Sequence, residues 1–152
     1  MEAQTEVEHT FLLEPGRWKL EGTWIERKAE PTPVKGRTLI TWTKDGWFTM
    51  ATKLTFPEAN LPEQTLTYKG RLDPDERRFS FILQHSVMGK IEGEGWVSHE
   101  SIIQRYWVMD DKQLRTGFQT TYRQSDDCYH LCNAVMAGTS FISNMEAVLT
   151  RS

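Results

Sequence analysis

Residues 64–85 read QTLTYKGRLDPDERRFSFILQH, and their alternation decides the class of the fold. Apolar and polar residues alternate on both sides of Asp73-Pro74-Asp75, a combination that favours a type I turn. Successive side chains of a strand point to opposite faces, so the pattern predicts two antiparallel strands joined by a tight turn. The side chains expected to share one face are Leu66, Tyr68, Leu72, Phe79, Phe81 and Leu83.

Similar segments recur roughly every ten residues, each ending at turn-forming residues. A meander of about eight to ten such strands favours a closed antiparallel up-and-down β-barrel, because closure removes exposed sheet edges. A β-sandwich is the competing architecture, but it usually shows Greek-key crossovers. We therefore predict an all-β fold in one domain, residues 1–152, with the barrel at 16–151. The strands are expected at 16–27, 36–43, 46–55, 64–72, 77–85, 90–97, 101–109, 114–123, 128–136 and 139–151.

The segment before residue 16 is predicted to form a short helix that caps one barrel opening. Thr5 and Glu8 fit a capping box, and Pro15-Gly16 would end the helix, so the helical cap is placed at 1–15. Two longer connections are expected. The prolines of the first, 27–36, disfavour a central strand, and the second, 56–63, could form a lid over an opening.

Composition and charge limit the possible partners. The chain is 38% hydrophobic and 26% charged, as in globular domains, and its net charge is −3. It lacks the overall basic field that nucleic acids or anionic membranes attract, so neither is expected as a partner. The apolar run near the N-terminus, residues 11–13, is too short for a signal peptide or a membrane span, and we expect a cytoplasmic protein.

Both cysteines lie in the stretch DDCYHLC at 126–132, together with His130. On an extended strand Cys128 and Cys132 share a face but lie about 13 Å apart. That separation is too large for a disulfide or for ligation of one zinc ion. We predict an outer-face strand and no metal site.

Strand parity also selects the residues that would face the barrel interior. Side chains of this kind either line a ligand cavity or fill a core, and composition does not separate the two. On the last strand Phe141 is also expected inside. The candidate ligand-lining residues are Tyr68, Phe81, Leu83, Phe118, Tyr122, Tyr129, Asn133 and Met145.

The segment IIQRYWVM at 102–109 has apolar residues in both parities. If Arg105 and Trp107 face inward, they join the candidate ligand-binding residues. A buried Arg105 would then bind a ligand carboxylate or pair with an internal acid such as Glu26. In the opposite parity Arg105 faces solvent, as arginines usually do.

Gly16-Arg17-Trp18 opens the first predicted strand, and Arg151 ends the last. This arrangement resembles the Gly-x-Trp signature of the lipocalins and their calycin relatives, whose tryptophan closes one barrel end beneath a basic side chain. The resemblance implies that Arg151 stacks on Trp18 and joins the first and last strands. It also implies a barrel that binds or carries a small hydrophobic or amphipathic ligand.

Among intracellular calycins the chain resembles the fatty-acid-binding proteins, the phycobiliprotein lyases and the nitrobindin-like heme barrels. The last group ligates iron through a histidine on the final strand. The corresponding segment here, ISNMEAVL at 142–149, has no histidine, so heme is disfavoured and no cofactor is assigned.

Two other functions stay open. His85, at the inward end of its strand, is a weak catalytic candidate as the general base of a lyase or isomerase that handles a cofactor or pigment. No nucleophile or pair of carboxylates accompanies it. The outer surface could instead dock a protein partner or a second copy of the chain, and Trp96 is the first residue to consider there.

Overall fold

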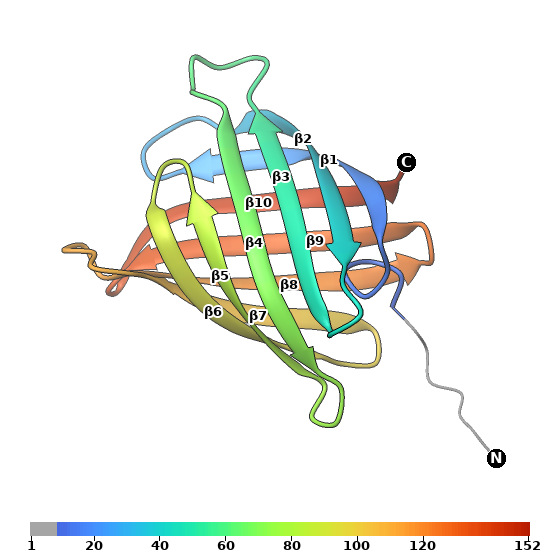
Figure 1. Cartoon of the computed structure of the whole chain (residues 1–152). Coiled ribbons are helices and arrows are strands. Elements are labelled where there is room, and N and C mark those ends of the chain that lie inside the picture. Colours follow the sequence, from blue (N-terminus) through green and yellow to red (C-terminus); the bar gives the residue numbers. More distant parts are fainter. Residues whose placement is uncertain (1–8) are drawn as a thin grey trace.

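Ten antiparallel strands form a closed barrel in the described part of the chain (Figure 1). The structure is a computed structural model and describes residues 9–152. No helix in this range is long and apolar enough to cross a membrane. The strands are β1 (Gly16–Glu26), β2 (Thr32–Trp42), β3 (Trp47–Thr55), β4 (Gln64–Asp73), β5 (Arg78–His85), β6 (Gly89–Val97), β7 (Ser101–Val108), β8 (Arg115–Ser125), β9 (Cys128–Ala137) and β10 (Ser140–Arg151).

Each strand pairs with the next one in sequence, and β1 pairs with β10 to close the barrel. The closing register runs from Trp18 opposite Arg151 to Glu26 opposite Ser143. The predicted closed meander is therefore confirmed. Most boundaries differ by one or two residues, and the largest difference is at β2, which begins at Thr32 and includes Pro33, opposite Thr23. Proline is tolerated there because it lies close to the start of the strand.

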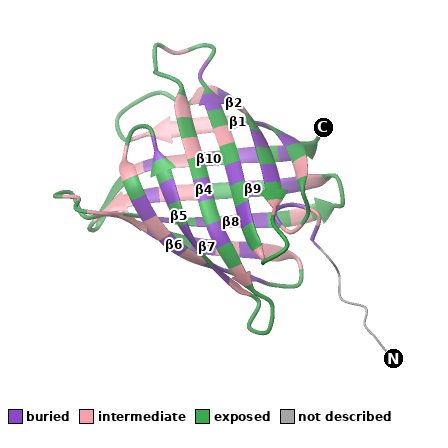
Figure 2. Cartoon of the chain, in the orientation of Figure 1, coloured by how far each residue is buried: buried purple, intermediate pink, exposed green. Residues whose placement is uncertain are grey.

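Buried and exposed residues alternate along the strands, as the banded ribbon of Figure 2 shows. Four glycines on the inward parity, Gly70, Gly93, Gly95 and Gly117, make room for aromatic rings of a neighbouring strand. A Cβ atom added at Gly93 would overlap the Phe81 ring, and one added at Gly117 would overlap the Tyr106 ring. These glycines therefore admit large rings to the interior rather than leaving it empty.

Residues 9–15 block one opening of the barrel. We call this segment the plug and this opening the plug end. The connections 43–46, 74–77, 98–100 and 126–127 lie at the same end. The predicted helix is wrong for residues 9–15, which form turns; Thr5 and Glu8 lie outside the described residues.

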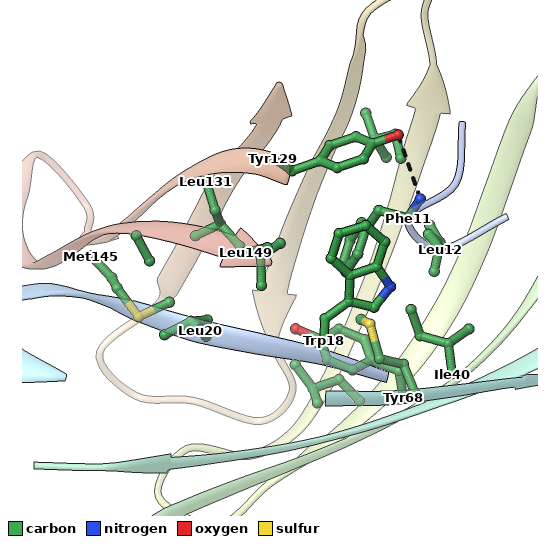
Figure 3. Packing of buried hydrophobic residues seen from close by; sticks show 14 of the residues in the cluster. Phe11, Leu12, Trp18, Leu20, Ile40, Tyr68, Tyr129, Leu131, Met145 and Leu149 are labelled. Carbon is green, nitrogen blue, oxygen red and sulfur yellow. Dashed lines mark hydrogen bonds between the residues drawn. The ribbon is translucent and has the colours of Figure 1, made fainter. Parts of the chain in front are cut away.

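The Tyr129 side chain explains why this segment is not helical. Its hydroxyl accepts hydrogen bonds from the backbone N–H groups of Thr10 (3.1 Å) and Phe11 (3.4 Å), in place of helical carbonyls. Figure 3 shows the bond to Phe11. His9 is buried between the same hydroxyl, 2.8 Å from its Nδ1, and the Ser98 carbonyl, 2.8 Å from its Nε2. The plug is thus anchored through side chains.

Trp18 lies beneath the plug, with Phe11 and Tyr129 packed edge-on against its ring (Figure 3). The Arg151 guanidinium lies over the indole at 5.4 Å from the ring centroid and pairs with Asp127 at 3.0 Å. The expected contact between the first and last strands is present. It joins β1, β10 and the turn after β8 at the plug end.

The parity expected for β8 is wrong, and on β7 the outward alternative for Arg105 is the one that the structure shows. Phe118 and Tyr122 face solvent, and they are 52% and 49% exposed. The register with β9 forces this result, because buried Leu131 lies opposite Thr121 and thereby places the alternate side chains of β8 outside. On β7, Arg105 and Trp107 lie on the outer face, where Arg105 stacks against Trp107 and pairs with Glu94 at 2.7 Å.

The inward position predicted for Phe141 from simple alternation is also wrong, because this residue is exposed at the start of β10. The register between β9 and β10 shifts between Phe141 and Ser143, and this irregularity moves Ile142 toward the core. The expected inward positions of Ser143, Met145 and Leu149 are correct, because all three are buried.

Candidate functional site

A cavity of about 180 Å³ lies inside the barrel toward the opening opposite the plug. We call this opening the loop end; it carries the connections 27–31, 56–63, 86–88, 109–114 and 138–139. Strands around the barrel and the 86–88 turn contribute to its walls. The apolar lining residues are Trp24, Leu54, Leu66, Leu83, Val87, Met88, Val135, Ile142 and Met145.

Polar side chains from three neighbouring strands form one wall of the cavity. Gln119 on β8 lies directly opposite Asn133 on β9, and the Asn133 Nδ2 donates to Gln119 Oε1 at 3.0 Å. The Asn133 amide also bonds to the Tyr106 hydroxyl on β7, with Nδ2 2.9 Å from the phenol oxygen. Burial raises the pKa of Tyr106 to about 12, so its hydroxyl stays protonated.

His85 ends β5 at the rim of the cavity and is 6% exposed. Its Nδ1 accepts hydrogen bonds from the backbone N–H groups of Val87 (3.0 Å) and Met88 (3.2 Å). An imidazole whose Nδ1 accepts must carry its proton on Nε2 when neutral. Burial, and then the charge of Arg115, lower the pKa of His85 to about 4, which keeps the ring neutral at physiological pH.

Arg115 also lines the cavity, at the start of β8. Its Nε donates to Asp111 Oδ2 at 2.8 Å, and this pairing is the main reason why the pKa of Asp111 falls to about 2. Across the opening, the Trp24 indole N–H donates to Glu26 Oε1 at 2.9 Å. The charged groups at the rim are thus held by neighbours within the protein.

Five of the predicted candidates line this cavity: His85, Tyr68, Leu83, Asn133 and Met145. Phe81 and Tyr129 are buried but do not line it, and Tyr129 belongs to the plug. The outer-face positions of Arg105, Trp107, Phe118 and Tyr122 remove these four from the interior.

Sequence reasoning missed Tyr106, Arg115 and Gln119. Arg115 and Gln119 follow from the opposite parity of β8, and Tyr106 follows from the parity of β7 that places Arg105 outside. One signal could have found that parity. Three other inward-facing strand glycines, Gly70, Gly93 and Gly95, lie beside aromatic rings. Gly117 in the same role places Tyr106 opposite it and Gln119 inside.

Solved structures that share this fold include two from different organisms. One, from M. tuberculosis, is the crystal structure of Rv2717c, with a TM-score of 0.69 and 14% identity over 90% of this chain and 91% of that one. The other is the S-type phycobiliprotein lyase CPES from Guillardia theta, with a TM-score of 0.59 and 13% identity over 90% of this chain and 85% of that one. No protein-family model matches the chain, and no curated protein matches it significantly. At these identities the likeness is one of fold.

The interior does not fit the heme group of a nitrobindin-like barrel. The buried residues of the final strand are Ser143, Met145, Ala147 and Leu149, so iron has no histidine ligand there. The imidazole at the cavity, His85, carries its proton on the nitrogen that would have to bind the metal. Among residues 9–152, no group of three or more His, Cys, Asp or Glu side chains is arranged to hold a metal ion.

Both cysteines are free, and they lie on the outer parity of β9 as predicted. Cys128 lies opposite Thr150, and Cys132 lies opposite Glu146. The two cysteines therefore belong to different residue pairs of β9 and β10, four residues apart along an extended strand, as the predicted separation of their Cα atoms requires.

Proposed function

We propose that this protein is a calycin-like barrel that binds a small, mainly apolar molecule in the cavity at the loop end. The observation that carries the proposal is the mixed lining of that cavity, in which apolar side chains surround one hydrogen-bonded polar wall. Binding pockets combine an apolar enclosure with a few oriented polar groups in this way. The second barrel opening is blocked by the plug, so the ligand would enter from the loop end.

The size of the cavity limits the ligand. Its 180 Å³ lies below the roughly 300–1,000 Å³ typical of pockets that hold drug-sized molecules. A compact molecule, such as one ring with a short substituent, matches this space. A long fatty acid or a tetrapyrrole would require the loop end to rearrange.

Carriage or sensing of this molecule is favoured over its chemical conversion. The cavity-lining histidine has its Nδ1 lone pair engaged by two backbone N–H groups and its proton on Nε2, which is the arrangement of a hydrogen-bond donor. A general base needs a free lone pair directed at the substrate. The role of general base for His85 is therefore not part of this proposal.

Native mass spectrometry after incubation with an extract of the host organism tests the proposal. The natural protein should retain a small non-covalent adduct, and Ser143→Leu, which adds volume at a buried cavity-lining position, should lose it. Ser80→Leu makes the same change on the outer parity of β5 and should keep the adduct. Loss of the adduct in both variants, or in neither, would contradict binding in this cavity.

A second candidate is a docking module for a protein partner. The observation in its favour is the exposure of two large aromatic residues, Phe118 and Tyr122, on the outer face of β8. A partner held by this face would still bind Ser143→Leu but would be lost on Phe118→Ser. A pull-down that compares these two variants separates docking from ligand binding.

A further inference from the structure

The 86–88 turn fixes the orientation of the His85 ring. Val87 and Met88 direct their backbone N–H groups at Nδ1, which determines both the tautomer and the rotation of the imidazole. Within residues 9–152 the other nitrogen, Nε2, makes no hydrogen bond, although the residue lines the cavity. A nearly buried N–H donor is thus left for a group that enters the cavity.

Tyr68 supplies a second donor. It lines the cavity, and it is a diagonal neighbour of His85 because Leu66, two residues away, lies directly opposite His85 on the paired strand. Its hydroxyl is in contact with the Gln104 side chain on β7, which opposes the effect of burial on the pKa of Tyr68. Burial raises the pKa of Tyr68 well above its usual value, so the hydroxyl keeps its proton.

Gln104 adds a third unsatisfied donor beside Tyr68. Its side chain faces that hydroxyl, and it is 5% exposed. The Gln104 Nε2 is buried and has no hydrogen-bond partner. Buried donors without partners cost roughly 1–3 kcal/mol each, which is a reason to expect an acceptor at this place in the functional state.

The acceptor atoms around the cavity are, by contrast, largely engaged. Gln119 Oε1 receives the Asn133 amide, Asn133 Oδ1 receives the Tyr106 hydroxyl at 3.1 Å, and Glu26 Oε1 receives the Trp24 indole. The buried side-chain atom that has no partner at this place in residues 9–152 is a donor, Gln104 Nε2. A ligand that complements it presents an acceptor.

We infer that the ligand binds through a neutral carbonyl oxygen, as in a ketone, aldehyde, ester or amide, which accepts hydrogen bonds from His85 Nε2 and the Tyr68 hydroxyl. The inference rests on the proposed binding function and names the chemical class of the ligand. A carbonyl oxygen has two lone pairs, so it satisfies two convergent donors at once.

The charges at the rim favour a neutral acceptor over a carboxylate. The positive charge of Arg115 is already matched by the Asp111 carboxylate. Both the guanidinium and the backbone N–H of Arg115 donate hydrogen bonds to that carboxylate. The remaining donors belong to uncharged side chains. A carboxylate would lose its hydration without gaining an unpaired cation, and burial of such a charge is costly.

Three probes of similar size test the inference by titration of the natural protein in two-dimensional NMR. Acetophenone carries a neutral carbonyl, α-methylstyrene replaces its oxygen with a methylene group, and benzoate carries a charge. We expect acetophenone to bind roughly tenfold more tightly than α-methylstyrene, the factor that corresponds to one buried hydrogen bond of about 1.4 kcal/mol. Benzoate should bind more weakly than acetophenone.

Two variants locate the effect. Tyr68→Phe removes only the hydroxyl, and His85→Asn keeps an oxygen to accept the Val87 and Met88 N–H groups while it loses the Nε2 donor. Each should reduce the preference for acetophenone by severalfold and leave α-methylstyrene unaffected. Tyr122→Phe, which removes an exposed hydroxyl on the outer face, should change neither affinity.

The possible outcomes separate the two proposals. Equal binding of acetophenone and α-methylstyrene would overturn the carbonyl inference and leave binding in the cavity intact. Tighter binding of benzoate than of acetophenone would overturn the inference of a neutral acceptor and would indicate an anionic ligand. If none of the three probes shifts the signals of cavity residues, both the inference and the proposed function fail.

Discussion

Acidification should destabilise the protein through His85, with a magnitude that follows from its burial. The pKa of His85 is lowered from 6.5 in the unfolded chain to about 4 in the fold, mainly by burial and then by the charge of Arg115. Between these two values the unfolded state binds more protons than the folded state, so stability falls as the pH falls. Between about pH 7.5 and about pH 4.5, His85 should remove roughly 2 to 3 kcal/mol from the free energy of unfolding.

Urea unfolding followed by tryptophan fluorescence measures this loss, with His85→Asn as the matched variant. Asparagine does not titrate, and its side-chain oxygen can still accept the N–H groups of Val87 and Met88. Contributions from the other histidines cancel when the two proteins are compared at each pH. The reasoning is refuted if the stability difference between the natural protein and His85→Asn stays constant within about 0.5 kcal/mol, the scale of an ordinary surface change, across this range.

Three further changes test the packing. Tyr129→Phe removes the hydroxyl that holds His9 and two backbone N–H groups, and it should cost roughly 1–3 kcal/mol in urea unfolding; an unchanged midpoint would contradict the anchoring of the plug. Gly117→Ala should cost about 1–3 kcal/mol, because the new methyl overlaps the Tyr106 ring, and should shift the NMR signals of the Asn133 amide; neither change would occur if that space were free. Arg151→Ala should lower the free energy of unfolding by only about 1 kcal/mol, since the ion pair of Arg151 is partly solvated and its stacking on Trp18 is the main loss. A loss several times larger in the same assay would contradict this account and would mean that the plug end depends on Arg151.

The barrel could be predicted because its strands alternate clearly and its turns are short. Residues 64–85 illustrate this, since one face of the hairpin carries apolar side chains and glycine between Gln64 and His85 at its ends, and the turn residues agree with the pattern. The contact between Trp18 and Arg151 was also predictable, because Gly16-Arg17-Trp18 resembles the lipocalin signature, which implies a basic side chain over the tryptophan. Four cavity-lining positions, Tyr68, Leu83, His85 and Asn133, follow from the same alternation.

The polar wall of the cavity could not be predicted from local alternation. The interior of β8 holds Gly117, Gln119 and Thr121, while its aromatic residues Phe118 and Tyr122 face solvent. This is the reverse of the usual preference, and only the pairing with β9 reveals it. The tautomer of His85 depends on the turn that follows β5, so it is likewise a property of three-dimensional structure.

The indole N–H signals of the tryptophans test the central claim most directly. Among the six tryptophans only Trp24 lines the cavity, whereas Trp47 and Trp96 are exposed on the outer face. A proton–nitrogen correlation spectrum recorded with the small-molecule fraction of a host extract should shift the Trp24 indole and leave Trp47 and Trp96 in place. Shifts confined to Trp47 or Trp96, with Trp24 unchanged, would contradict a ligand inside the barrel and would favour recognition by the outer surface.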